Sequence, residues 1–204
     1  KEVVMTAIKY HGTTSCYLYT ALQYASRELK SDRIFVMDAL KYTAWVFVHV
    51  SGELQNDREV VMAAVKKEGS TLRYASDEMK NDRQIVVAAI IADGRNLEYN
   101  ILGSVLQYAS EELKGHFDTV MVAVKQCGQA LKYASNELKG NFDIGMAALE
   151  QDLNAFYLLN QQEFIVAVAH CSSECHYNNT NKRQQPISFT TTMEENKLIR
   201  KKNR

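Results

Sequence analysis

Proline, cysteine and net charge are all scarce in this 204-residue sequence, and each scarcity excludes a class of structure or partner. The one proline, Pro186, lies near the C-terminus, so it interrupts no helix upstream. The four cysteines are too few and too unevenly spaced for a disulfide framework, which predicts a reducing compartment. We therefore expect an intracellular protein, and the sequence does not choose between the cytoplasm and an organellar lumen or stroma.

Charge of one sign and long hydrophobic runs are also missing. Lysine plus arginine and aspartate plus glutamate both number 24, so the formal net charge is zero. Such a chain has no excess of basic residues to bind phosphate groups, so we expect no nucleic-acid partner. The longest apolar run, residues 85–92, is far shorter than the roughly 20 residues of a membrane-spanning helix, so we predict no transmembrane segment.

What the sequence does contain is a repeat. The stretch Leu-Lys-Tyr-Ala-Ser-Asn-Glu-Leu-Lys at 131–139 has near-copies that begin at Leu22, Leu72 and Leu106, and a degraded copy that begins at Phe47. Successive copies are 25 residues apart, except for a step of 34 that indicates a nine-residue insertion between Gly94 and Gly103. Because self-similarity at a fixed period is typical of stacked structural units, we interpret the chain as a repeat array.

Each repeat is predicted to contain two helices, an apolar one such as 60–65 and the signature helix such as 72–80. A candidate N-cap residue precedes the apolar helix in four repeats: Asp32, Asp57, Asp82 and Asn141. Glycines that are expected to end it in the left-handed conformation are Gly12, Gly69, Gly94 and Gly128. The predicted fold is all-α, an α-solenoid of about six two-helix repeats of about 25 residues over 1–170, followed by a polar tail at 171–204 that is flexible or docked on a partner.

Equivalent positions of the repeats form ladders. The signature serines and alanines are small, which predicts close approach of neighbouring helices. The signature tyrosines (24, 74, 108 and 133) and glutamates (28, 53, 78, 112 and 137) lie four residues apart within each predicted helix, which leaves room for a hydroxyl–carboxylate contact. On the solvent face, Arg73 and Asp77 are expected to pair. An active site is usually one asymmetric constellation, whereas these residues recur four or five times, so we expect no enzyme.

The signature Leu-x-Tyr-Ala-Ser-x-Glu-Leu-Lys, followed by Asn-Asp-Arg-x-Val-Val-x-Ala-Ala-Val and a glycine, resembles the repeat of a family catalogued as domain of unknown function 4116. The resemblance covers about residues 2–150. It implies a tandem array of helices and names no particular activity.

One cluster has residue types that bind metals: His170, Cys171, Cys175 and His176. Cys171 and Cys175 share a helix face at i, i+4, and zinc uses such ligands. However, His170 and Cys171, like Cys175 and His176, are neighbours that point in different directions on a helix. No second cysteine pair supports them, so we predict no metal and no other cofactor.

Interaction residues are expected where the repeat becomes irregular, because insertions in repeat arrays often map to one binding face. The candidates are Trp45, Phe47 and His49 in the degraded copy, and Arg95, Asn96 and Tyr99 in the insertion. The favoured function is a non-enzymatic scaffold or linker that binds other proteins as a structural subunit of a larger complex. An enzyme or ligand pocket in the solenoid groove is one alternative. The other is the recognition part of a longer effector-like protein, since the sequence starts with Lys1 and not with methionine.

Overall fold

The computed structural model describes residues 1–11, 21–93, 105–162, 164 and 165. The chain divides into two units, 1–167 and 168–204, and every described residue belongs to the first. The predicted boundary at 170 and the polar tail therefore lie outside the described residues.

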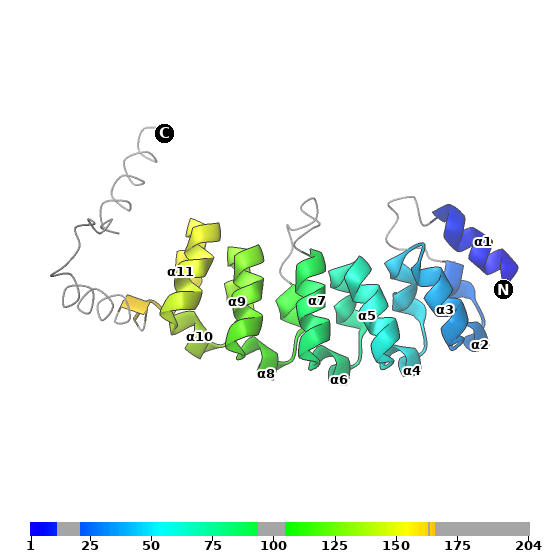
Figure 1. The fold of residues 1–204 in the computed structure, drawn as a ribbon, viewed down its shortest axis with the longest axis horizontal. Helices are drawn as coiled ribbons and strands as arrows, with labels where there is room; N and C mark the ends of the chain where they lie inside the picture. Colours follow the sequence, from blue (N-terminus) through cyan, green and yellow to red (C-terminus); the bar gives the residue numbers. More distant parts are fainter. Residues whose placement is uncertain (12–20, 94–104, 163, 166–204) are drawn as a thin grey trace, which may run out of the picture. The chain divides into compact units, whose positions relative to one another are not determined.

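All elements within the described ranges are helices, of three kinds (Figure 1). The long α-helices are α1 (Glu2–His11), α3 (Arg33–Leu40), α5 (Arg58–Lys67), α7 (Arg83–Asp93), α9 (Phe117–Gln126) and α11 (Phe142–Gln151). The short α-helices are α2 (Arg27–Lys30), α4 (Gly52–Gln55), α6 (Asp77–Lys80), α8 (Glu111–Lys114) and α10 (Asn136–Gly140). The 3-10 helices are η1 (Ala21–Tyr24), η2 (Ala44–His49), η3 (Gly69–Tyr74), η4 (Val105–Tyr108), η5 (Gly128–Tyr133) and η6 (Leu153–Leu158). The predicted all-α repeat is confirmed.

Each repeat consists of a 3-10 helix, a short α-helix and a long α-helix, so the two-helix prediction was wrong in one respect. The signature is not one helix. In the third repeat η3 ends at Tyr74, Ala75 and Ser76 are extended, and α6 begins at Asp77. The described residues contain five such repeats, from η1–α2–α3 to η5–α10–α11, with α1 before them and η6 after them.

The signature serine interrupts the helix within the signature. It was predicted only to allow close packing of neighbouring helices. The hydroxyl of Ser76 accepts a hydrogen bond from the backbone N–H of Met79, 3.3 Å away, and so caps α6. Ser26, Ser110 and Ser135 cap α2, α8 and α10 in the same way. A capping serine has extended backbone, so the signature cannot continue as one helix through it.

The helices pack in two layers. Neighbouring long helices contact each other in order from α1 to α11, and neighbouring 3-10 helices do the same from η1 to η6. Each long helix also contacts one or two 3-10 helices, so the apolar long helices are covered on several sides. The first signature residue of every repeat is fully buried between the layers: Leu22, Phe47, Leu72, Leu106 and Leu131.

Backbone hydrogen bonds join each repeat to the next at the short helices. The N–H of Ser76 donates to the carbonyl of Gln55 at 3.0 Å, and the N–H of Ser135 donates to that of Lys114 at the same distance. Equivalent bonds run from Ser51 to Lys30 and from Ser110 to Lys80. The bond from Asn160 to Lys139, 3.1 Å, carries this pattern beyond residue 150, where the sequence repeat fades.

The glycines have a different role from the one that we predicted. Gly69 and Gly128 are the first residues of η3 and η5, and neither has left-handed backbone. A Cβ atom on Gly69 would lie 2.2 Å from the carbonyl oxygen of Ala89 in α7, and one on Gly128 would lie 2.5 Å from that of Ala148 in α11. These glycines are needed for close approach between the two layers. Gly12 and Gly94 lie outside the described residues.

The longest helix of the described part is α7, with 11 residues. None of the described helices has the length and apolar character needed to cross a bilayer.

Candidate interaction surface

Several of the predicted site residues fall outside the part of the chain that the structure describes. They are the metal candidates His170, Cys171, Cys175 and His176, and the insertion residues Arg95, Asn96 and Tyr99. Within the described ranges, no group of three or more histidine, cysteine, aspartate or glutamate side chains could hold a metal ion.

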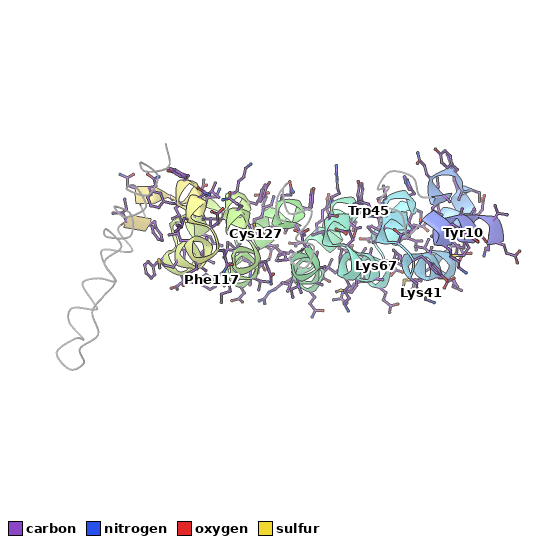
Figure 2. The ribbon with its side chains drawn as sticks, turned by 90° about the horizontal axis from the view of Figure 1, so that it is seen from above. Tyr10, Lys41, Trp45, Lys67, Phe117 and Cys127 are labelled. Atoms are coloured by element: carbon purple, nitrogen blue, oxygen red, sulfur yellow. The ribbon has the colours of Figure 1, made fainter. Side chains whose placement is uncertain are left out.

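The other three candidates lie on η2, where they differ in accessibility. Phe47 is fully buried, at the core position that Leu22 and Leu72 occupy in neighbouring repeats, so no partner can reach it. Trp45 and His49 are half-buried. Figure 2 shows Trp45 in the row of helices that contains the 3-10 helices, and Phe117 in the row of long helices. Burial lowers the pKa of His49, the positive charge of Lys30 lowers it further, and the imidazole is therefore neutral at pH 7.

Serine and glutamate are residue types that would first be considered for catalysis, and in the third and fourth repeats the signature serine and glutamate both bond to the preceding repeat. Asn56, at the end of α4, donates from Nδ2 to Glu78 at 3.1 Å and accepts a hydrogen bond from the hydroxyl of Ser76. We call this arrangement the asparagine clamp. Asn81 makes the same clamp with Glu112 and Ser110 in the next repeat. Sequence reasoning missed it, although the recurrence of asparagine at the 25-residue step was a visible signal.

Two of the four junctions between the five repeats lack the clamp, which leads to a prediction. At these junctions Ser31 and Gly115 replace the asparagine, with almost the same backbone angles as Asn56. Ser51 is the signature serine of the repeat after Ser31, and in the described structure its hydroxyl is buried without a hydrogen-bond partner. We expect Ser31→Asn to raise the free energy of unfolding by about 1 kcal/mol, because it supplies that partner. Gly115→Asn should have a similar effect, since a Cβ there meets nothing closer than 3.5 Å. Urea denaturation followed by circular dichroism measures the free energy of unfolding of both variants. If neither variant is more stable than the wild type, the asparagine clamp does not stabilise the array.

A second ladder joins the N-termini of the long helices. Arg33 Nε donates to Asp57 at 2.7 Å, and Arg58 Nε donates to Asp82 at 2.8 Å. These aspartates also cap α5 and α7, as predicted. Lys1 pairs with Asp32 and Arg83 with Asp118, so each pair joins two consecutive long helices. The ladder stops at α9 and α11, whose first residues are Phe117 and Phe142.

The ladder predicts a pH dependence of stability. Hydrogen bonding to Arg33 lowers the pKa of Asp57, and the N–H of Val60 lowers it further. An acid with a lowered pKa in the folded state contributes stability above its unfolded pKa and loses it as the pH falls through the folded value. Asp93 acts in the opposite sense, because burial raises its pKa and the stability that it contributes is lost as the pH rises. Since hydrogen bonds also lower the pKa values of Asp32 and Asp152, we expect unfolding to become easier below about pH 4.

The variant Asp57→Asn keeps an oxygen that can cap α5 but removes the titrating charge. Its free energy of unfolding should therefore change less between pH 7 and pH 3 than that of the wild type. Asp143→Asn, which removes an exposed carboxylate outside the ladder, serves as the control for the substitution. If the free energy of unfolding changed equally with pH in the wild type and in both variants, Asp57 would not contribute to the pH dependence of stability.

The last residues of the 3-10 helices η1 to η5 form a further row, which we call the tyrosine row: Tyr24, His49, Tyr74, Tyr108 and Tyr133. Tyr24 is 76% exposed, and the other members are half-buried. The Cζ atom of Arg73 lies 5.1 Å from the ring centroid of Tyr74 and 6.0 Å from that of Tyr108, so it bridges two repeats. The expected pair of Arg73 with Asp77 was wrong, since Asp77 pairs with Lys80 instead. In the fifth repeat Lys132 lies over Tyr133 at 5.7 Å.

Taken together, these contacts define a tandem helical-repeat protein in which recurring polar residues link each repeat to the next. A family model described as Domain of unknown function (DUF4116) matches residues 1–55, 57–114, 100–139 and 116–164, and the chain belongs to this family. The resemblance inferred from the signature is therefore confirmed. No curated protein and no solved structure matches the chain significantly.

Proposed function

We propose that this repeat array is a non-enzymatic scaffold that binds another protein over the tyrosine row and Trp45, as a structural subunit of a larger assembly. One observation carries the proposal. Most of the other recurring polar residues have partners within the array: the capping serines, the two clamp asparagines with Glu78 and Glu112, and the arginine–aspartate ladder. The tyrosine row recurs just as regularly, yet its side chains keep exposed surface.

The chemistry of the row supports a protein partner. Tyrosine and tryptophan are enriched at protein interfaces because they combine a large apolar ring with a polar group and lose little conformational entropy on binding. Arginine shares this enrichment, and Arg73 lies between two rings of the row. Arg95, Asn96 and Tyr99 of the insertion remain part of the proposal as further contacts.

Site-specific photo-crosslinking in the native source tests this function. A benzophenone amino acid is placed at Tyr108 or Trp45, and at the exposed Lys66 on α5 as the control. We expect one protein of defined mass to crosslink from the first two positions and not from position 66. Identical products from all three positions, or none from Tyr108 and Trp45, would overturn the proposal. The mass of the native complex then shows whether the chain is part of a larger assembly.

A further inference from the structure

We propose that the segment which binds the tyrosine row is a proline-rich peptide in the polyproline II conformation, with one turn of the peptide on each repeat. This inference rests on the proposed function and adds the chemistry of the partner. It is carried by the spacing of the rings and by the hydrogen-bonding groups beside them.

The spacing comes from Arg73, which touches rings of two successive repeats. Its Cζ lies 5.1 Å from the centroid of Tyr74 and 6.0 Å from that of Tyr108, which places the two centroids no more than about 11 Å apart. This is an upper limit. Packed helices have axes about 8–10 Å apart, so rings at the same position of contacting 3-10 helices are expected to lie about 8–10 Å apart, within that limit.

Few regular peptide conformations repeat at this distance. A polyproline II helix has three residues per turn and a rise of 3.1 Å, so equivalent side chains recur about every 9 Å. Residues on one face of a β-strand recur about every 6.7 Å, which does not match. An α-helix could match with every seventh residue, about 10.5 Å apart. Spacing alone therefore leaves polyproline II and an α-helix.

The hydrogen-bonding groups of the surface separate these two. Gln23, Arg73 and Lys132 each precede a tyrosine of the row, and all three are exposed and carry N–H donors. The tyrosine hydroxyls can donate as well. The repeated glutamates lie four residues further on, in the short helices, where Glu78 and Glu112 accept hydrogen bonds from asparagines. The row is thus rich in donors.

A surface rich in donors and aromatic rings suits a ligand that offers carbonyl oxygens and apolar rings but few N–H groups. A proline-rich segment is such a ligand, because proline has no N–H and the polyproline II backbone leaves its carbonyls free. The carbonyls of an α-helix are already bonded within the helix. Docking of polyproline II segments on aromatic residues is also a common mode of peptide recognition.

Fluorescence anisotropy with the full chain and labelled oligoprolines of 6, 9, 12 and 15 residues tests the inference. We expect saturable binding that tightens with each added group of three prolines until the row is filled. A 15-residue Gly-Ser peptide and a 15-residue peptide of Glu-Ala-Ala-Ala-Lys repeats are the negative controls, for a flexible and a helical ligand. Equal or tighter binding of the helical peptide would overturn the assignment.

Variants locate the site. Tyr108→Ala and Arg73→Gln are expected to weaken binding of the 15-residue oligoproline at least tenfold, whereas Lys66→Ala should leave it unchanged. Tyr24→Ala changes a side chain that is already 76% exposed, so it keeps the fold and should weaken only the longer peptides. If Tyr108 crosslinks to a partner but oligoproline does not bind, the scaffold stands and the polyproline assignment falls. If oligoproline binds equally to all the variants, the tyrosine row is not its site and the assignment falls as well.

Discussion

Gly69→Ala is expected to lower the free energy of unfolding by about 3 kcal/mol, the upper end of the usual cost of overpacking. The new methyl carbon would lie 2.2 Å from the carbonyl oxygen of Ala89 and 3.0 Å from the backbone N of Asp93. Both neighbours are backbone atoms of α7, so no side chain can rotate to make room. The layers must separate at this point, and the packing around the buried Leu72 is disturbed with them.

Gly52→Ala is the matched control. Gly52 is the first residue of α4, and a Cβ there meets nothing within 4 Å. Because alanine is a better helix former than glycine, this variant should be as stable as the wild type or up to about 1 kcal/mol more stable. Thermal and urea denaturation compare the two variants. Equal midpoints for them would contradict the close approach seen at Gly69.

The second repeat carries Ala44 at the position of Gly69, within a 3-10 helix of different sequence. The array therefore accepts a methyl group there when the rest of the helix changes as well. The Gly69→Ala variant adds the methyl group without those other changes, so we expect a loss of stability. Because the second repeat accommodates Ala44, we do not expect complete unfolding.

Leu131→Ala is expected to cost about 2–5 kcal/mol, as for other large-to-small substitutions in a core. Leu131 is fully buried on η5, a helix that contacts α9, α11 and the 3-10 helices on both sides. Removing its side chain leaves a cavity where two layers and three repeats meet. Stability in repeat arrays comes from contacts between neighbours, so the effect should extend beyond the fifth repeat.

Lys132→Ala is the control for this prediction, because Lys132 is the exposed neighbour of Leu131. Its amino group lies over the ring of Tyr133, an exposed contact worth about 0.5–1 kcal/mol at most. Urea denaturation monitored by circular dichroism should place the midpoint of Leu131→Ala well below that of Lys132→Ala. Comparable midpoints would show that Leu131 does not hold the layers together.

Much of the helical content could be predicted because its signals lie within one repeat. The N-caps Asp57, Asp82 and Asn141 stand next to the apolar residues whose first amides they bond, so short-range sequence identifies them. The serine caps carried a similar signal, since Ser76 precedes two acidic residues in the first turn of α6. The uninterrupted pattern of apolar residues, however, predicts one continuous helix.

The candidate site was less predictable. Irregularity in the sequence drew attention to Phe47, but the bulky side chain fills a core position that leucine occupies in other repeats. The tyrosines were visible as a ladder, yet their contacts with Arg73 depend on the position of the next repeat. Side chains that meet across repeats cannot be paired from spacing within one of them.

The sequence by itself determined the period, the helical class and the family, because each of these is a local pattern that recurs. Only the tertiary structure decided why Gly69 is a glycine, which partners Arg33 and Asn56 bind, and which aromatic residues stay accessible. The physical reason is distance. Those features depend on the few ångströms that separate one repeat or layer from the next, and that separation is set by the packing of all the side chains between them.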